Sequence, residues 1–398
     1  MNDMMTKLKS KWLRFKETDG FHTLMGSLFA IGVGLLIGII IIILVNPSES
    51  GEGILRLIKG FMNHPRGAWI GLGQLLYRIT PLIFTGLAVA FAFKTGLFNI
   101  GASGQYTVGL FAASMVGILG DSLGGFQWIV AVFAGMAAGF IWGAVPGIFK
   151  AFFNVHEVIT SIMFNYIGMY LVNGLLNSSF LRTRVVDGTT NRTLVVDQAA
   201  RTSYGPFNAI FPNSGLDISF LIAVAVAVIL FLVLNKTVFG RELKSVGMNR
   251  DAAKYAGVNE KRSLILSMAI AGMIAGLGGA LFILAPSTRN LGNAYAIENV
   301  ILPAGFNGIP VALLANSNPL GVILSTLFIG HITLGGASMQ SVGFVSEIVD
   351  IIIGVILYFS AFALIMTQYL GKFKDYVAKR KKDKSLPPST EEVKEGKQ

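Results

Sequence analysis

Long apolar runs alternate with short polar segments along most of the chain. Each run is close to the roughly 20 residues that an α-helix needs to cross a bilayer. The first run is too long for the apolar part of a secretory signal and has no small-residue cleavage site, so we expect it to be retained. The pattern predicts an all-α polytopic membrane protein of about ten transmembrane helices, near residues 24–45, 70–93, 97–119, 126–149, 157–176, 217–235, 263–285, 296–315, 319–336 and 346–369.

The polar segments set the expected organisation of the chain. Residues 1–23 form a basic N-terminus, and residues 24–370 form the transmembrane domain. Within this domain we expect residues 177–217 to form an extracellular loop and residues 236–262 a cytoplasmic loop. Residues 371–398 have the Lys-rich, Pro-containing composition of a disordered tail.

Composition and charge agree with a membrane protein. Only 13% of the residues are charged, against about 25% in soluble domains. With ten spans and a cytoplasmic N-terminus, 23 of the 32 Lys and Arg residues fall in cytoplasmic segments, eight fall outside, and Arg78 lies within a span. This bias predicts a multi-pass membrane protein with both termini in the cytoplasm. It also explains the net charge of +11 by topology and lipid headgroups rather than by nucleic acid.

Several kinds of chemistry are disfavoured by the residues themselves. The chain has no cysteine and four scattered histidines, so we expect no disulfide, no catalytic thiol and no metal site. It contains no Walker A motif and therefore does not carry its own nucleotide motor of that type. The acids near the membrane, such as Glu157 and Glu298, fall at expected helix starts, where the helix dipole accounts for them. A secondary transporter would need a coupling acid at mid-membrane, and the sequence does not offer a convincing one.

The polar loop between two apolar runs contains an expected short helix over Arg250–Ala256. Asn249 suits its N-cap, Asp251 its first turn and Gly257 the position after its end. A rigid helix on the cytoplasmic side suits a transporter that is driven by a separate motor. We expect Ala252, Ala253 and Ala256 to face that motor, with Tyr255 as an anchor. The expected coupling residues are Arg250, Asp251, Ala252, Ala253, Tyr255, Ala256 and Gly257.

Glycine and proline interrupt two apolar segments in different halves of the chain. Gly96–Gln105 and Leu302–Pro310 each place a Phe-Asn pair among glycines. Non-helical backbone at membrane depth is tolerated only where it is buried in protein or lines a cavity. Such segments point to a translocation pathway. Glycines also recur every fourth residue at Gly135, Gly139, Gly143 and Gly147, and again at 272 and 276; we expect packing between helices of the same chain rather than a dimer face.

Three motifs resemble those of the permease subunits of bacterial ABC importers, in the superfamily of the branched-chain amino acid and ribose permeases. They are the Gly96–Gln105 segment, the loop G-R-E-L-K-S-V-G-M-N-R-D-A-A-K-Y-A-G-V, and G-I-P-V-A-L-L followed by N-P-L-G. The run K-T-G-L-F-N-I-G-A-S-G-Q is most similar to the nucleoside importers that work with Bmp-type lipoproteins. The resemblance covers roughly residues 70–370 and implies a location in the bacterial cell membrane.

The resemblance implies a permease subunit rather than an enzyme, with ATP and Mg²⁺ bound by a separate ATPase and no cofactor in this chain. It further implies a second permease subunit as a heterodimer partner, an extracellular substrate-binding lipoprotein, and a nucleoside as substrate. A branched-chain amino acid or a simple sugar is the alternative substrate, and an ion-coupled secondary transporter, a channel or a scaffold is an alternative class. We expect the substrate pathway to include Phe98, Asn99, Gln105, Phe306 and Asn307.

Overall fold

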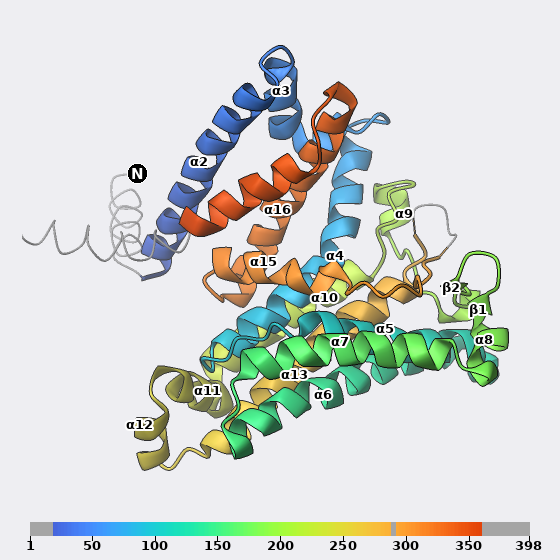
Figure 1. Cartoon of the computed structure of the whole chain (residues 1–398), viewed down its shortest axis with the longest axis vertical. Coiled ribbons are helices and arrows are strands. Elements are labelled where there is room, and N and C mark those ends of the chain that lie inside the picture. The colour runs from blue at the N-terminus through green and yellow to red at the C-terminus, as the bar shows by residue number, and fades with distance from the viewer. Residues whose placement is uncertain (1–18, 288–291, 360–398) are drawn as a thin grey trace, which may run out of the picture. The chain divides into compact units, whose positions relative to one another are not determined.

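The computed structural model describes residues 19–287 and 292–359, and nearly all of its regular structure is helical (Figure 1). The basic segment 1–18, the end of the tenth apolar run (360–369) and the tail 371–398 lie outside the described residues. The helices are α2 (Asp19–Val45), α3 (Ser50–Lys59), α4 (Ala68–Phe93), α5 (Ala102–Leu119), α6 (Gln127–Phe153), α7 (Glu157–Leu176), α8 (Ser179–Val185), α9 (Phe207–Ile210), α10 (Ser219–Lys236), α11 (Val238–Met248), α12 (Arg250–Tyr255), α13 (Glu260–Leu284), α14 (Pro303–Phe306), α15 (Gly308–Leu314) and α16 (Pro319–Met339). Residues 347–359 are also helical.

The chain divides into two compact units. The first consists of residues 1–39 and 354–398, of which the helical residues 19–39 and 354–359 are described. Within it, a Cβ placed on Gly34 would lie 2.2 Å from Cγ1 of Ile356, so these two helical stretches pack closely. The second unit, residues 40–353, contains the two interrupted segments and the polar loop.

Eight of the described helices are long and apolar enough to cross a membrane: α2, α4, α5, α6 (with the 3₁₀ turn before it), α7, α10, α13 and α16. The chain is therefore a multi-pass membrane protein. The predicted interruption at Leu302–Pro310 is confirmed: within the expected span 296–315, non-helical backbone leads into the two short helices α14 and α15. Two prolines, Pro303 and Pro310, and the glycines between them are poor residues for a long helix. The tenth expected span is helical over 347–359, up to the limit of the described residues.

Glycines hold α5, α6 and α13 together at the centre of the second unit. A Cβ on Gly139 of α6 would lie 2.3 Å from the carbonyl oxygen of Gly272 on α13, and one on Gly276 would lie 2.5 Å from the carbonyl oxygen of Gly135. At the same place, a Cβ on Gly109 of α5 would lie 2.3 Å from the Cα of Gly276, and one on Gly135 would lie 2.9 Å from the carbonyl oxygen of Gly109. Such distances allow only glycine, so the predicted packing of the glycine stripe within the chain is confirmed.

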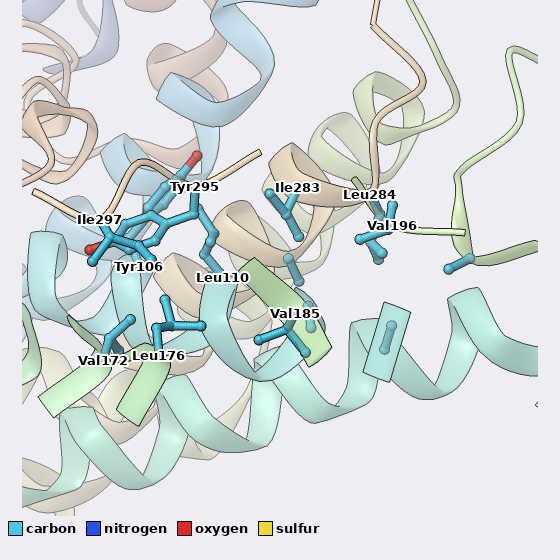
Figure 2. Close-up of a cluster of buried hydrophobic side chains, with 14 of the residues drawn as sticks. Tyr106, Leu110, Val172, Leu176, Val185, Val196, Ile283, Leu284, Tyr295 and Ile297 are labelled. Carbon is cyan, nitrogen blue, oxygen red and sulfur yellow. The ribbon is translucent and has the colours of Figure 1, made fainter. Parts of the chain in front are cut away.

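The helices α5, α6, α7 and α13 run side by side between α11 and α12 at one end and α8 at the other (Figure 1). We call these the α12 end and the α8 end. Near the α8 end, buried apolar side chains from α5, α7 and α13 meet Val185 of α8 and the extended segment that carries Tyr295 and Ile297 (Figure 2). This core fixes the extended segment against the helices.

The segment 177–217 is ordered as a small lobe rather than an irregular loop. It contains α8, α9, the 3₁₀ turn Gln198–Ala200 and a two-stranded antiparallel sheet of β1 (Val186–Asp187) and β2 (Arg192–Thr193). Its end is anchored by the buried carboxylate of Asp217, which accepts hydrogen bonds from Thr202 and, at 2.5 Å, from Ser219 Oγ. The carbonyl oxygen of Leu284 at the end of α13 accepts from the backbone N–H of Thr202 at 2.9 Å, so the lobe is tied to the helical body.

Glu157 forms an ion pair in addition to its position at a helix start. At the corner between α6 and α7, Lys150 Nζ lies 2.9 Å from its Oε2, and both side chains are about nine-tenths buried. The corner itself turns at Asn154, whose φ of 51° is left-handed. The acid therefore joins two helices at the α12 end, which the helix-start position alone does not reveal.

Candidate functional site

The first interrupted segment begins where α4 ends in a Schellman motif. The backbone N–H of Leu97 donates to the carbonyl of Ala92 at 3.2 Å, and that of Gly96 donates to Phe93 at 3.0 Å. Gly96 has a φ of +72°, a conformation that favours glycine. The chain then continues without regular helix to the start of α5 at Ala102. The sequence K-T-G therefore stops one helix and directs the chain into a short non-helical stretch.

Two predicted pathway residues bind each other within this stretch. Asn99 Nδ2 donates to Gln105 Oε1 at 2.9 Å, and Gln105 Nε2 donates to Asn99 Oδ1 at 3.1 Å. Both side chains are completely or almost completely buried. The neighbouring Phe98 is half-buried and stacks on Phe93, with ring centroids 5.0 Å apart. In this conformation Asn99 and Gln105 shape the turn, and the exposed surface of the segment comes from its other residues.

Asn165 of α7 clamps the same turn. Its Oδ1 accepts from the backbone N–H of Gly104 at 2.7 Å, and its Nδ2 donates to the carbonyl of Ile100 at 3.0 Å. It thereby satisfies one of the free N–H groups at the start of α5, as an N-cap would, but from another helix. Asn165 lies eight residues, about 12 Å along the axis, from the start of α7. The start of α5 therefore lies inside the helical body and not at its end.

The stretch from Tyr295 to Asn316, which contains the second interrupted segment, runs through the helical body from the α8 end to the α12 end. Near the α8 end, Tyr295 Oη donates to Asn173 Oδ1 at 2.9 Å, and Asn173 Nδ2 donates to the carbonyl of Glu298 at 2.8 Å. At the α12 end, Lys94 Nζ donates to the carbonyl oxygen of Asn316 at 3.3 Å, just after α15. Between these anchors the chain is extended to Leu302 and then forms α14 and α15.

The two interrupted segments meet inside the helical body. A Cβ on Gly305 of α14 would lie 2.2 Å from the backbone nitrogen of Ser103 in the first turn of α5. A Cβ on Gly308 would lie 2.5 Å from the backbone of Thr85 on α4. The Phe-Asn pair of the second segment falls between these two contacts. Phe306 is half-buried and Asn307 is exposed.

Arg78 adds a charged group on the same side of α4. It lies seven residues, about two turns, from Thr85, so both residues lie on one side of that helix. Arg78 is exposed although it lies within a candidate membrane span. A charged side chain in such a span faces a protein partner or water rather than lipid. The exposed Asn307 must also face protein or water rather than lipid, because it lies in an interrupted segment without continuous helix.

The predicted short helix is present as α12, and its caps are those that the sequence indicated. Asn249 Oδ1 accepts from the backbone N–H of Ala252 at 3.0 Å, and Gly257 has a φ of +83°. The N–H of Val258 donates to the carbonyl of Ala253 and that of Gly257 to Lys254, both at 3.0 Å, which completes a Schellman motif. The helix ends at Tyr255, with Ala256 as its C-cap.

Ala252, Tyr255 and Ala256 are exposed as expected, and Ala253 is the exception. Ala253 was predicted to face a partner, but only 3% of its surface is exposed, because it faces inward in this chain. Arg250 is half-buried, whereas Asp251, Ala252, Ala256 and Gly257 are exposed. Tyr255 is 95% exposed, and Met248, at the end of α11, is 87% exposed. These two large side chains, together with Ala252 and Ala256, lie on the exposed surface of the loop.

Sequence reasoning missed the residues that join the loop to the first interrupted segment. A Cβ on Gly247 of α11 would lie 2.5 Å from the carbonyl oxygen of Lys94 and 3.0 Å from the nitrogen of Gly96. Burial lowers the pKa of Lys94, and the positive charge of Lys244 on α11 lowers it further. Gly247 lies only two residues before the cap of α12, but no local pattern marks it. Only the three-dimensional structure shows which helical glycines make a close backbone contact.

Comparison with known proteins gives one family. Residues 71–361 match the family described as branched-chain amino acid transport system / permease component. This range contains both interrupted segments and the α11–α12 loop. No solved structure matches the chain.

Individual relatives are similar over most of the chain. The guanosine ABC transporter permease protein NupP of Bacillus subtilis is 35% identical over 88% of this chain and 97% of its own length. The nucleoside ABC transporter permease protein NupB of Lactococcus lactis is 34% identical over 87% and 93%. The glucose ABC transporter permease protein TsgB13 of Haloferax volcanii is 30% identical over 80% and 82%. The first two bacteria each have a second such permease, NupQ and NupC, which match at 24% and 26% identity.

Proposed function

Because the chain belongs to the branched-chain amino acid transport system / permease component family, we propose that it is the membrane-spanning subunit of an ATP-driven importer of nucleosides. The proposal that the substrate is a nucleoside rests on the similarity to two nucleoside permeases over nearly their whole length. The more distant glucose permease makes a simple sugar the second candidate.

The loop of α11 and α12 supplies the surface on which a separate ATPase docks. Met248 and Tyr255 project two large apolar side chains that no described part of the chain covers. A short helix capped at both ends is rigid enough to be pushed as a unit. Aromatic residues in such positions dominate many interfaces, so Tyr255 is the main anchor. ATP and Mg²⁺ bind to that partner and not to this chain.

The substrate pathway runs along the face where the two interrupted segments meet. Glycines let the segments approach closely, and polar groups there cannot face lipid. Phe98, Phe306 and Asn307 line the pathway, while Asn99 and Gln105 hold the turn from which it is built. Aromatic rings suit the faces of a base, and amides suit its edges.

The remaining partners follow from the same proposal. A second permease subunit covers the face that carries Arg78 and Asn307. The paired permeases of the related systems support a heterodimer. The α12 end, rich in Lys and Arg, faces the cytoplasm together with both termini. An extracellular lipoprotein captures the substrate and delivers it to the α8 end.

The function is tested by uptake into vesicles that contain this chain, the second permease and the ATPase. We expect ATP-dependent uptake of labelled guanosine that unlabelled nucleosides inhibit and that leucine, ribose and glucose leave unchanged. Inhibition by glucose, ribose or leucine but by no nucleoside would replace the substrate class. Uptake driven by an ion gradient in vesicles without the ATPase would identify a secondary transporter instead.

Single cysteines test the pathway, since the native chain has none. We expect Asn307→Cys to react with a small polar thiol reagent, and its rate to change with the nucleotide on the ATPase. Asn99→Cys reacts more slowly, because residue 99 is completely buried. Ile141→Cys is the control, because Ile141 is 65% exposed on α6 but lies in an apolar stretch that faces lipid. If position 307 reacts no faster than position 141 in every nucleotide state, the pathway lies elsewhere.

A further inference from the structure

The turn of Lys94, Thr95 and Gly96 is the place where the α11–α12 loop touches the interrupted segments. Gly247 of α11 lies against the backbone of this turn, as described above, and a Cβ on Gly96 would in return lie 3.3 Å from the carbonyl oxygen of Gly247. The contact joins backbone to backbone, so no flexible side chain can absorb a movement of α11. A displacement of α11 must move the turn or break the contact.

The turn has two further contacts, one on each side. Thr95 is completely buried, and its Oγ1 donates to Ser267 Oγ on α13 at 2.7 Å. Lys94 Nζ donates to the carbonyl oxygen of Asn316, which follows α15 and the second interrupted segment. Asn316 and Ser317 both have positive φ, at 48° and 53°, so the backbone there is already in an unfavourable conformation. The turn is thus bonded both to a packed helix and to the end of α15.

These contacts place the turn between the exposed surface of the loop and the start of α5. On one side, Gly247 is adjacent in sequence to the exposed Met248. On the other side, the turn is followed by residues 97–101, which lead to the Asn99–Gln105 pair and the start of α5. The path from loop to pathway is therefore short and made of backbone.

From this arrangement we propose that Lys94, Thr95, Gly96 and Gly247 form the junction that transmits movement of the α11–α12 loop to both interrupted segments. These residues are positioning residues, because they touch neither substrate nor nucleotide. When the loop is pushed, Gly247 shifts the turn against α13, and Lys94 carries the end of α15 with it. The inference rests on the proposed function, since it requires that a separate ATPase moves the loop.

The variant Gly247→Ala tests the junction in the complete importer of this chain, second permease and ATPase. Alanine is the better helix former, so α11 itself is not weakened, but its Cβ must push the carbonyl of Lys94 away. We expect the ATPase to remain bound and ATP hydrolysis to stay within about twofold, while guanosine uptake falls by about tenfold or more. The matched control is Gly174→Ala, a helical glycine with open space around it, which should transport normally.

A reversible bridge gives a second test that does not depend on how well the alanine variant folds. In Thr95→Cys combined with Ser267→Cys, oxidation ties the turn to α13. We expect uptake to stop on oxidation and to return on reduction, while ATP hydrolysis continues. Normal uptake with either the alanine or the oxidised bridge in place overturns the proposal.

The thiol reactivity at position 307 tests this inference independently of the substrate assignment. In the single variant Asn307→Cys, we expect nucleotide on the ATPase to change the rate at which the thiol reacts. In the double variant with Gly247→Ala, we expect nucleotide to leave that rate unchanged. This measurement needs no knowledge of the substrate. Absence of guanosine uptake by the native importer would reject the proposed function, whereas a nucleotide response that Gly247→Ala preserves would reject the junction.

Discussion

Replacement of Tyr255 by Asp is expected to release the ATPase from the importer and to abolish ATP-driven uptake. Tyr255 is 95% exposed in this chain, so the substitution leaves the fold of α12 and its caps unchanged. In the complex, however, it places an unpaired carboxylate in a desolvated contact. Loss of one such anchor weakens an interface by about 2 kcal/mol or more, or roughly 30-fold in affinity.

Co-purification with the ATPase and uptake into vesicles measure this effect. Tyr255→Phe is the control, because it keeps the ring and should bind and transport normally. Met248→Asp should weaken binding in the same direction, as Met248 is the second exposed apolar side chain of the loop. If Tyr255→Asp binds the ATPase and transports like the native chain, α12 is not the docking helix.

Replacement of Gly276 by Leu is expected to prevent assembly of the helical body. A Cβ at this position would lie 2.5 Å from the carbonyl oxygen of Gly135 on α6, and Gly109 of α5 also lies against the backbone of Gly276. Overpacking costs about 1–3 kcal/mol in a core that can adjust. Here three backbones must separate, and packing between helices is the main force that holds them together in a membrane.

Thermal unfolding and size-exclusion profiles in detergent measure the loss. We expect Gly276→Leu to give little monodisperse protein, and Gly139→Leu to behave in the same way. Gly174→Leu is the control, because the space around Gly174 is open, and it should unfold near the native temperature. A native unfolding temperature for Gly276→Leu would mean that the glycine contacts do not limit stability.

Local features of the sequence determined α12. Its N-cap is a side-chain hydrogen bond over three residues, and its end needs one glycine with positive φ, so both signals lie within the helix and its flanks. The burial of Ala253, unlike the exposure of Ala252, Tyr255 and Ala256, could not be predicted in this way. Ala253 is buried by the fold of its own chain, and a helix of two turns carries no apolar periodicity long enough to reveal that.

The pathway shows the same division. The sequence located both interrupted segments, because Gly and Pro disfavour helix wherever they are. It did not show that Asn99 and Gln105 bind each other, that Asn165 caps α5 from another helix, or that Gly305 lies against Ser103. For the span 296–315, it placed the start at residue 296, whereas the backbone is non-helical up to Leu302 and α14 begins at Pro303. Average hydrophobicity does not distinguish a helical residue from an extended one.

The sequence by itself therefore determined the class of the protein, eight of its spans, the caps of α12 and the positions of the helix breaks. All of these depend on the composition and backbone preferences of residues close together in the chain. Only the tertiary structure decided that Ala253 is buried and Met248 free, and that the backbones of Gly247 and Lys94 touch. The contact between Gly247 and Lys94 joins groups far apart in the chain, and a glycine that permits close contact has the same local signature as one that faces open space.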